Sequence, residues 1–399
     1  MDRLLGQDIQ HLPAGAGSDH LIALGGETGG QGGNDLLFVV ADENTVHGKE
    51  LLCVKIKRCG GFIPRRTICF QKGRTSCRSR LRRWAAETRC SMGFHWGLQK
   101  KAAKEMGYFP NSQARALKTN RTYNLGVMYL DEAGSGLTHE FFAKVLDSFK
   151  TTAEAAGYDI TFINRDVGKQ KMSTYEHCKY RNVDGVIIAC TDFTSQDVYE
   201  VINGDIPVVT IDHIFDCRTA IMSNNEKGME ELINYVTKMG HRKIAFIQGN
   251  RSAVAERRLA GFYKACMTRG ISVDPDWILN GDYHNPDLTY KLTKELLSRE
   301  NKPTCVFMPD DYSAMGAFNA VKEMGLSVPE DISIVGYDGI AYSQLLSPKL
   351  TTYLQDTDLI GVTAAKQLVS LIENPQTTFK EVITVDGKLL EGGSVSDIN

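Results

Sequence analysis

Acidic residues directly follow two apolar segments that read as buried strands. Asp212 comes after the run PVVTI, and the pair Asp310 and Asp311 comes after CVFMP. Arg258 lies near the start of a helical segment, and its guanidinium fork can bridge two neighbouring oxygen atoms. Carboxylates and a guanidinium group suit the adjacent hydroxyls of a polyhydroxylated molecule. The expected chemistry is therefore noncovalent recognition.

Motifs of covalent catalysis and metal binding do not occur in the sequence. It has no G-x-S-x-G elbow, no H-E-x-x-H helix and no Cys/His pair in a supporting context. Five of the ten cysteines lie in the first quarter without forming a C-x₂₋₄-C pair. We expect no metal site, no cofactor and no enzymatic activity.

The composition is that of an ordinary globular protein, 42% hydrophobic and 24% charged. No apolar run approaches the roughly 18 residues needed to cross a membrane. The N-terminus lacks the apolar region of a secretory signal, so we expect a cytoplasmic protein without a membrane partner.

The two parts of the chain differ in charge. Residues 1–98 carry 14 Lys and Arg against 9 Asp and Glu, whereas residues 99–399 carry 32 against 39. An acidic core does not adhere to nucleic acid unaided, so DNA binding would need a separate basic element.

The elements that must position these residues alternate from about residue 120 onward. The sequence predicts strands at 125–130, 160–164, 186–189, 207–211, 243–248, 277–279, 305–308 and 332–336. It predicts helices at 141–156, 226–239, 255–269, 287–298 and 314–324. Short apolar strands, each followed by an amphipathic helix, indicate two doubly wound lobes with parallel sheets. Such sheets bind ligands beyond the carboxyl ends of their strands.

From about Lys100 to the C-terminus the sequence resembles the LacI/GalR (lactose/galactose repressor) family of bacterial transcription factors. The matching segments, in chain order, are MGYFPNSQARAL (106–117), DGVII (184–188), IPVVTID (206–212), GHRKIAF (240–246), ERRLAGF (256–262) and VPEDISIVGYD (328–338). One such segment could arise by chance, but the ordered set identifies the chain as similar to this family.

The resemblance implies an α/β fold of two doubly wound parallel-sheet lobes, similar to type I periplasmic binding proteins, after an irregular N-terminal extension. The effector-binding core would span 122–399. Its first lobe would comprise about 122–222 and 353–377, and its second about 223–352 and 378–399. Three crossing segments would act as a hinge between the lobes.

The N-terminal residues depart from the family pattern. The family begins with a helix-turn-helix headpiece, but only 99–121 match, as the last headpiece helix and the hinge helix. We expect 1–98 to be a poorly ordered or frame-shifted segment, with a genuine alternative N-terminus left open.

The segment Ser112–Asn120 resembles the family's hinge helix. Nine residues are too few for a stable isolated helix, so we expect it to order only on DNA within a homodimer. Leu117 matches the residue that wedges into the minor groove, and Arg115 and Lys118 could reach phosphates or groove edges. Ala114 belongs to the same expected DNA-contact set. Without a headpiece, a plain linker is the stronger interpretation.

The resemblance also implies an effector site in the cleft between the lobes. Arg258 and Asp311 match the family's ligand arginine and aspartate. Phe141, Phe142 and Tyr283 match aromatic cleft positions, and Asp212 ends a strand on the lobe opposite Arg258 and Asp311. Each has a structural alternative: Asp311, for example, could simply cap a helix. Asp310, His241 and Asp338 are interpreted as structural.

The function implied is that of a repressor in which a small effector controls binding to operator DNA. A sugar is expected, with a purine or another polar metabolite left open. Two alternatives remain: a headpiece-less sugar-binding dimer that does not bind operator DNA, and a periplasmic-type sugar-binding protein.

Overall fold

The computed structural model describes residues 21–25, 36–46, 49–55, 67–71, 121–130, 134, 136–164, 166–167 and 170–399. The chain divides into two compact units, residues 1–111 and 112–399. In the first unit, four strands form one antiparallel sheet in chain order, which the sequence did not predict: β1 (Leu21–Gly25), β2 (Leu36–Val46), β3 (Lys49–Lys55) and β4 (Thr67–Gln71). The predicted hinge residues Ala114, Arg115, Leu117 and Lys118 lie outside the described residues.

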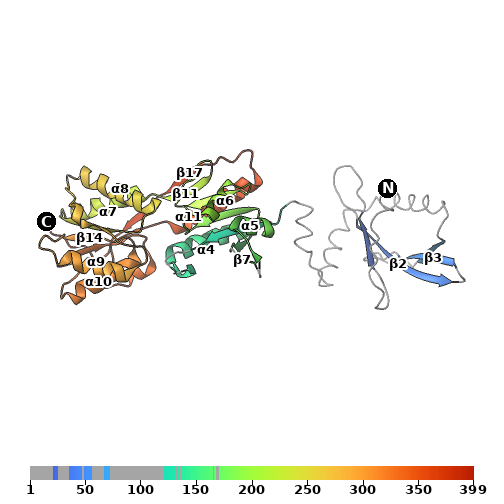
Figure 1. Ribbon diagram of the computed structural model, residues 1–399, viewed down its shortest axis with the longest axis horizontal. Helices are drawn as coiled ribbons and strands as arrows, with labels where there is room; N and C mark the ends of the chain where they lie inside the picture. The colour runs from blue at the N-terminus through green and yellow to red at the C-terminus, as the bar shows by residue number, and fades with distance from the viewer. Residues whose placement is uncertain are drawn as a thin grey trace. The chain divides into compact units, whose positions relative to one another are not determined.

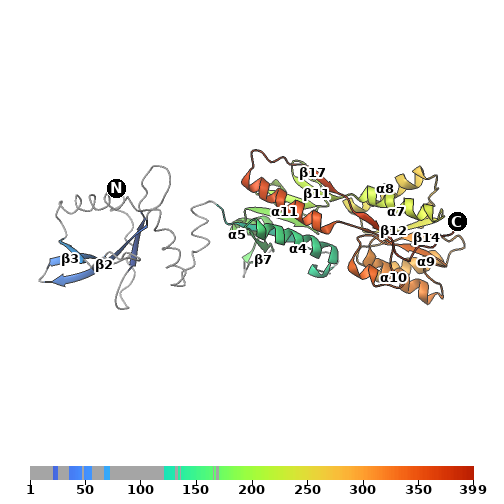
Figure 2. The same ribbon diagram turned by 180° about the vertical axis from the view of Figure 1, so that it is seen from behind.

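The first lobe of the second unit is built on a six-stranded parallel sheet of order β17-β11-β10-β9-β5-β6 (Figures 1 and 2). Its strands are β5 (Asn124–Tyr129), β6 (Asp159–Phe162), β9 (Gly185–Ala189), β10 (Val208–Ile211), β11 (Thr219–Ser223) and β17 (Val382–Val385). Every residue of β9, β10 and β11 is buried, as expected of strands covered on both faces.

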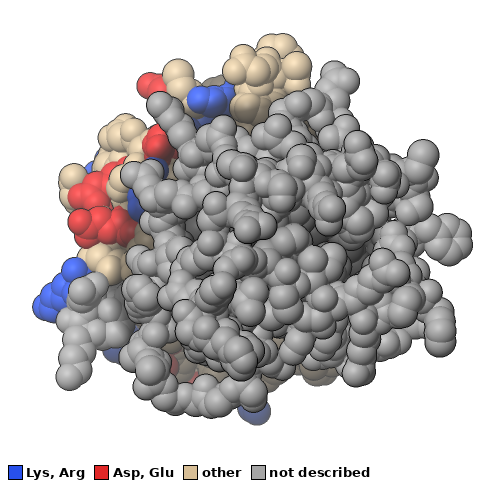
Figure 3. All heavy atoms as spheres, turned by 90° about the vertical axis from the view of Figure 1, so that its right-hand side faces the viewer, with Lys and Arg blue, Asp and Glu red and all other residues tan. Residues whose placement is uncertain are grey.

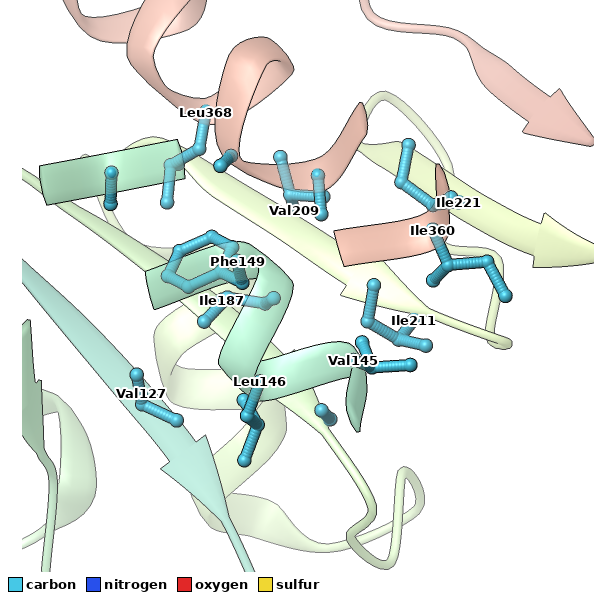
Figure 4. Close-up of a cluster of buried hydrophobic side chains, with 14 of the residues drawn as sticks. Val127, Val145, Leu146, Phe149, Ile187, Val209, Ile211, Ile221, Ile360 and Leu368 are labelled. Atoms are coloured by element: carbon cyan, nitrogen blue, oxygen red, sulfur yellow. The ribbon is translucent and has the colours of Figure 1, made fainter. Parts of the chain in front are cut away.

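Helices cover both faces of this sheet. They are α4 (Glu140–Ala155), α11 (Thr357–Glu373), α5 (Thr174–Arg181) and α6 (Gln196–Asn203). Figure 4 shows α4 and α11 directing Phe149 and Leu368 toward Ile187 and Val209 of the strands. Each such buried aliphatic or aromatic side chain stabilises the fold by about 1.5–3 kcal/mol. Helices α5 and α6 pack on the opposite face.

The second lobe repeats this arrangement with a parallel sheet of order β13-β12-β14-β15 (Figure 1). Its strands are β12 (Ile244–Gln248), β13 (Ile278–Asn280), β14 (Cys305–Phe307) and β15 (Ser333–Val335). Its helices are α7 (Asn225–Lys238) and α8 (Ala253–Thr268) on one face, and α9 (Pro286–Leu297) and α10 (Asp311–Glu323) on the other. The predicted α/β architecture of two parallel-sheet lobes is confirmed.

Smaller elements complete the second unit. Strands β16 (Thr352–Leu354) and β18 (Lys388–Leu390) pair in antiparallel fashion, as do β7 (Asp166–Val167) and β8 (Gln170–Lys171). The described residues of this unit also form the 3₁₀ helices η2 (Gly136–Thr138), η3 (Pro275–Trp277) and η4 (Ala341–Gln344).

The chain crosses between the lobes three times: from β11 to α7, from β16 to α11, and from β17 to β18. The sequence placed 378–399 entirely in the second lobe. The structure instead puts Val382–Val385 in the first lobe, because β17 pairs with β11. The last crossing therefore occurs at Asp386–Gly387.

The visible surface of the described residues carries charges of both signs. In Figure 3, Asp and Glu side chains and Lys and Arg side chains lie next to each other where described atoms reach the edge of the view. None of the helices in the described part of the chain is long and apolar enough to cross a membrane.

Candidate functional site

A cavity of about 540 Å³ lies between the two lobes. The first lobe lines it with the start of α4 and the segments that follow β5, β9 and β10. The second lobe contributes the start of α8 and the segments that follow β12, β13 and β15. The cavity therefore lies beyond the carboxyl ends of both parallel sheets, where the predicted fold places a ligand.

Five of the six effector residues proposed from the sequence line this cavity: Phe141, Phe142, Asp212, Arg258 and Tyr283. The two phenylalanine rings meet edge to face, with centroids 5.0 Å apart. They provide an apolar wall at the start of α4.

Asp311 does not line the cavity and is only 1% exposed. Its Oδ1 accepts a hydrogen bond from the Thr352 hydroxyl at 2.6 Å, and its Oδ2 accepts one from the backbone N–H of Ile340 at 2.9 Å. This corrects the expectation for Asp311, because both carboxylate oxygens are used inside the second lobe. Its neighbour Asp310 caps α10 by accepting from the backbone N–H of Ser313 at 2.7 Å.

Arg258 is held in place from four directions and is 5% exposed. Its Nε donates to Asn225 Oδ1 at 2.9 Å, and its two terminal nitrogens donate to the carbonyl oxygen of Pro309 at 2.8 Å and to Asp338 Oδ1 at 3.1 Å. The guanidinium carbon lies 3.7 Å from the centroid of the Tyr337 ring. The group is therefore preorganised beside the cavity before any ligand arrives.

Asp338 and Gln355 are cavity residues that sequence reasoning missed. Gln355 Nε2 donates to Asp338 Oδ1 at 2.7 Å, which turns Gln355 Oε1 away from the carboxylate. Within the described part of the chain, that buried Oε1 has no hydrogen-bond partner. Burial raises the pKa of Asp338 to about 7, although Arg258 beside it favours the ionised form. Neither residue lies in a helix or strand whose periodicity could have indicated a site.

The first lobe adds a second unpartnered polar atom. The buried hydroxyl of Thr191, which follows β9, finds no hydrogen-bond partner among the described residues. Buried polar atoms are normally paired, so an orphaned one at a cavity wall indicates a missing ligand or water. Nearby, Asp212 accepts from the backbone N–H of Ser223 at 2.7 Å, and the rings of Phe193 and His213 stack 4.3 Å apart.

Contacts between the lobes close one side of the cavity. The rings of His139 in the first lobe and His284 in the second stack with centroids 3.7 Å apart. Beside them, Glu140 Oε1 accepts from the backbone N–H of Ala341 at 2.7 Å. The lobes are thus in contact across the cavity as well as through the crossing segments.

Replacing the orphaned hydroxyl gives a first prediction. Thr191→Val removes a buried, unpaired hydroxyl, so the ligand-free protein should be equally stable or more stable by up to about 1 kcal/mol. If the hydroxyl bonds the effector, affinity should fall by about 3- to 10-fold. Urea unfolding and calorimetric titration measure the two effects.

Thr289→Val is the matched control, because its hydroxyl is also buried and unpartnered among the described residues but lies on α9 outside the cavity lining. It should leave effector affinity unchanged. Equal effects of the two substitutions on affinity would contradict the role given to Thr191.

Asp338 gives a second prediction, for the dependence of stability on pH. Its folded-state pKa of about 7 lies above the ordinary value of 3.8, so the folded protein keeps a proton that the unfolded chain has lost. The contribution of this group is complete below about pH 4 and is lost as pH rises through about 7. The free energy of unfolding of the wild type should fall over this range relative to Asp338→Asn. Asp216→Asn, in an exposed loop outside the cavity, should show no such divergence.

Among the described residues, no group of three or more His, Cys, Asp or Glu side chains is arranged to hold a metal ion.

Comparisons with known proteins agree with this architecture. Residues 233–395 match the family described as periplasmic binding protein-like domain. The chain is 30% identical over 285 residues to the probable HTH-type transcriptional repressor ExuR of Bacillus subtilis, covering 70% of this chain and 84% of that protein. It is 33% identical over 304 residues to the HTH-type transcriptional repressor PurR of Klebsiella pneumoniae, covering 74% and 86%.

Solved structures of similar fold are also regulators. The lac repressor dimer bound to operator and the anti-inducer ONPF matches with a TM-score of 0.61 and 25% identity, over 72% of this chain and 99% of that chain. A complex of the transcriptional regulator CelR with cellobiose matches with a TM-score of 0.60 and 24% identity, over 74% and 89%. The latter likeness establishes the fold alone.

Proposed function

This chain belongs to the LacI/GalR family of transcriptional regulators, and on that premise we propose that it is a repressor whose effector occupies the cavity between the lobes. One observation carries the proposal. A preorganised Arg258 and the orphaned polar atoms of Gln355 and Thr191 converge on one interlobe space beside aromatic rings. Unpaired buried groups of this kind lower their free energy when a ligand supplies the missing hydrogen bonds.

The ligand proposed for this space is a sugar. Planar polar side chains such as Arg258, Asp338 and Gln355 can pair with adjacent hydroxyls, and Phe142 offers a face for the apolar side of a sugar ring. The relatives are repressors, and the proposal gives the cavity a binding role and no bond-breaking step.

Allosteric control would act through the relative position of the lobes. An effector can shift the lobe equilibrium only by binding one arrangement better than the other. Gln355 is suited to this role because it lies on the crossing segment between β16 and α11 and also lines the cavity. A ligand that bonds Gln355 would therefore contact a crossing segment of the hinge directly.

Operator binding is proposed to use a homodimer, as in the lac repressor dimer bound to operator. The residues proposed for DNA contact are Ala114, Arg115, Leu117 and Lys118, with Leu117 as the minor-groove wedge.

The test is an electrophoretic mobility shift of the 399-residue chain on DNA from upstream of its own gene, with light scattering for the oligomeric state. Sequence-specific retardation that a sugar changes would support the proposal. Sugar binding without any specific retardation would instead favour the headpiece-less alternative. A panel of sugars and the purines hypoxanthine and guanine, followed by thermal denaturation, tests the ligand class.

A further inference from the structure

The charged side chains that line the cavity are predominantly acidic. Among the described lining residues, four are carboxylates (Asp192, Asp212, Asp282 and Asp338) and two are guanidinium groups (Arg251 and Arg258). The Arg251 side chain is 93% exposed and pairs with Glu256 at 3.4 Å, so its charge is screened by solvent. Of these two arginines, Arg258 is therefore the one whose guanidinium group is buried.

The positive charge of Arg258 is already balanced. Asp338 pairs with it at 3.1 Å, and Asp212 also favours its charged form from across the cavity. Three nitrogens of the guanidinium donate to groups of the protein. Burial raises the pKa of both carboxyl groups. Once they are ionised, a ligand anion placed here would meet two negative charges as well as one positive charge, in a site where charges are poorly screened.

Three histidines, His139, His213 and His284, also line the cavity. Burial lowers the pKa of His213, which keeps its ring neutral near pH 7. The rings of His139 and His284 stack on each other, with centroids 3.7 Å apart.

Two of the hydrogen-bonding atoms left over at the cavity can only accept, beside the Thr191 and Tyr283 hydroxyls, which can also donate. Gln355 Oε1 has no partner in the described chain, and Asp338 Oδ2 makes no hydrogen bond there because both donors bond Oδ1. These acceptors need a donor on the ligand group that faces them, which a hydroxyl provides and an ionised carboxylate or phosphate group does not.

We infer that the effector is an uncharged polyhydroxy compound and that this cavity rejects the corresponding sugar acids and sugar phosphates. The inference rests on the proposed function and narrows its ligand class.

The test compares matched ligands at pH 8 by calorimetry. The panel pairs glucose and galactose with glucuronate, galacturonate and the 6-phosphates, and adds cellobiose. A neutral sugar should bind at least roughly tenfold more tightly than its acid or phosphate, the effect of one unscreened like charge. An acid or phosphate that binds as tightly as its neutral parent overturns the inference while leaving a sugar-binding repressor intact. If no member of the panel binds, the proposed sugar effector fails together with the inference.

A variant tests the electrostatic cause directly. Asp212→Asn removes one cavity charge while an amide oxygen remains to accept from Ser223, and asparagine tolerates the left-handed backbone at this position, where φ is +56°. The preference for the neutral sugar should shrink by roughly fivefold or more. Asp216→Asn changes the net charge equally but lies in an exposed loop outside the cavity lining, so it should leave the preference unchanged. Equal effects of both variants, or none from Asp212→Asn, would overturn the inference.

Discussion

Arg258→Met should abolish sugar binding and lower the free energy of unfolding by about 3–5 kcal/mol. The substitution keeps much of the side-chain volume but leaves Asp338 and Asp212 without their buried counter-charge. It also removes the donors to Asn225 and to the Pro309 carbonyl. Calorimetric titration should show a loss of affinity greater than about 100-fold, as expected for a central buried charge. Urea unfolding measures the stability.

The double variant Arg258→Met/Asp338→Asn separates stability from recognition. Removing the stranded carboxylate should restore part of the lost stability, because the two groups are coupled, while sugar binding stays absent. Arg258→Lys should keep the charge but lose the fork, giving a smaller loss of stability with weakened binding. Sugar affinity of Arg258→Met equal to wild type, in a protein shown to be folded, would remove Arg258 from the site.

Gly339→Ala should cost about 2–4 kcal/mol of stability and weaken sugar binding by at least about tenfold. Gly339 has a φ of +72°, and a Cβ there would lie 2.5 Å from the Cα of Leu354 on β16. The backbone must therefore shift at Gly339 or at Leu354. Asp338 directly precedes Gly339, and Gln355 directly follows Leu354. Both residues line the cavity, so the displacement should reach the ligand.

Gly325→Ala is the control for backbone strain alone. Gly325 has nearly the same φ, +70°, but nothing lies within 4 Å of a Cβ added there. Its replacement should cost about 1 kcal/mol and leave sugar affinity unchanged. If the two variants lost the same stability in urea unfolding, the close approach of Gly339 to Leu354 on β16 would have no energetic role.

The elements that the sequence predicted have a strong apolar pattern, although β11 and α11 were missed despite their buried apolar residues. The helix predicted at 141–156 is α4 (Glu140–Ala155), and the strand predicted at 186–189 is β9 (Gly185–Ala189). Helix α5 (Thr174–Arg181) was missed because its sequence is polar, with three buried side chains. Strand β17 was missed because its exposure is mixed, and this shifted the last crossing between the lobes.

The site divides in the same way. The alternation of apolar strands and amphipathic helices alone predicted two parallel-sheet lobes with a ligand site beyond their strand ends. The family resemblance implied Phe142, Arg258 and Tyr283, and all three line the cavity.

Only the tertiary structure decided which polar groups serve the cavity and which serve the fold. Asp310 and Asp311 are adjacent and chemically identical, yet their side chains point in different directions. Asp310 caps α10, whereas Asp311 accepts hydrogen bonds from the Ile340 N–H and the Thr352 hydroxyl. Gln355 and Asp338 become cavity residues through pairing across a gap of 17 positions. Local sequence carries no signal for such a contact, because it exists only once the segment after β15 has folded against the segment after β16.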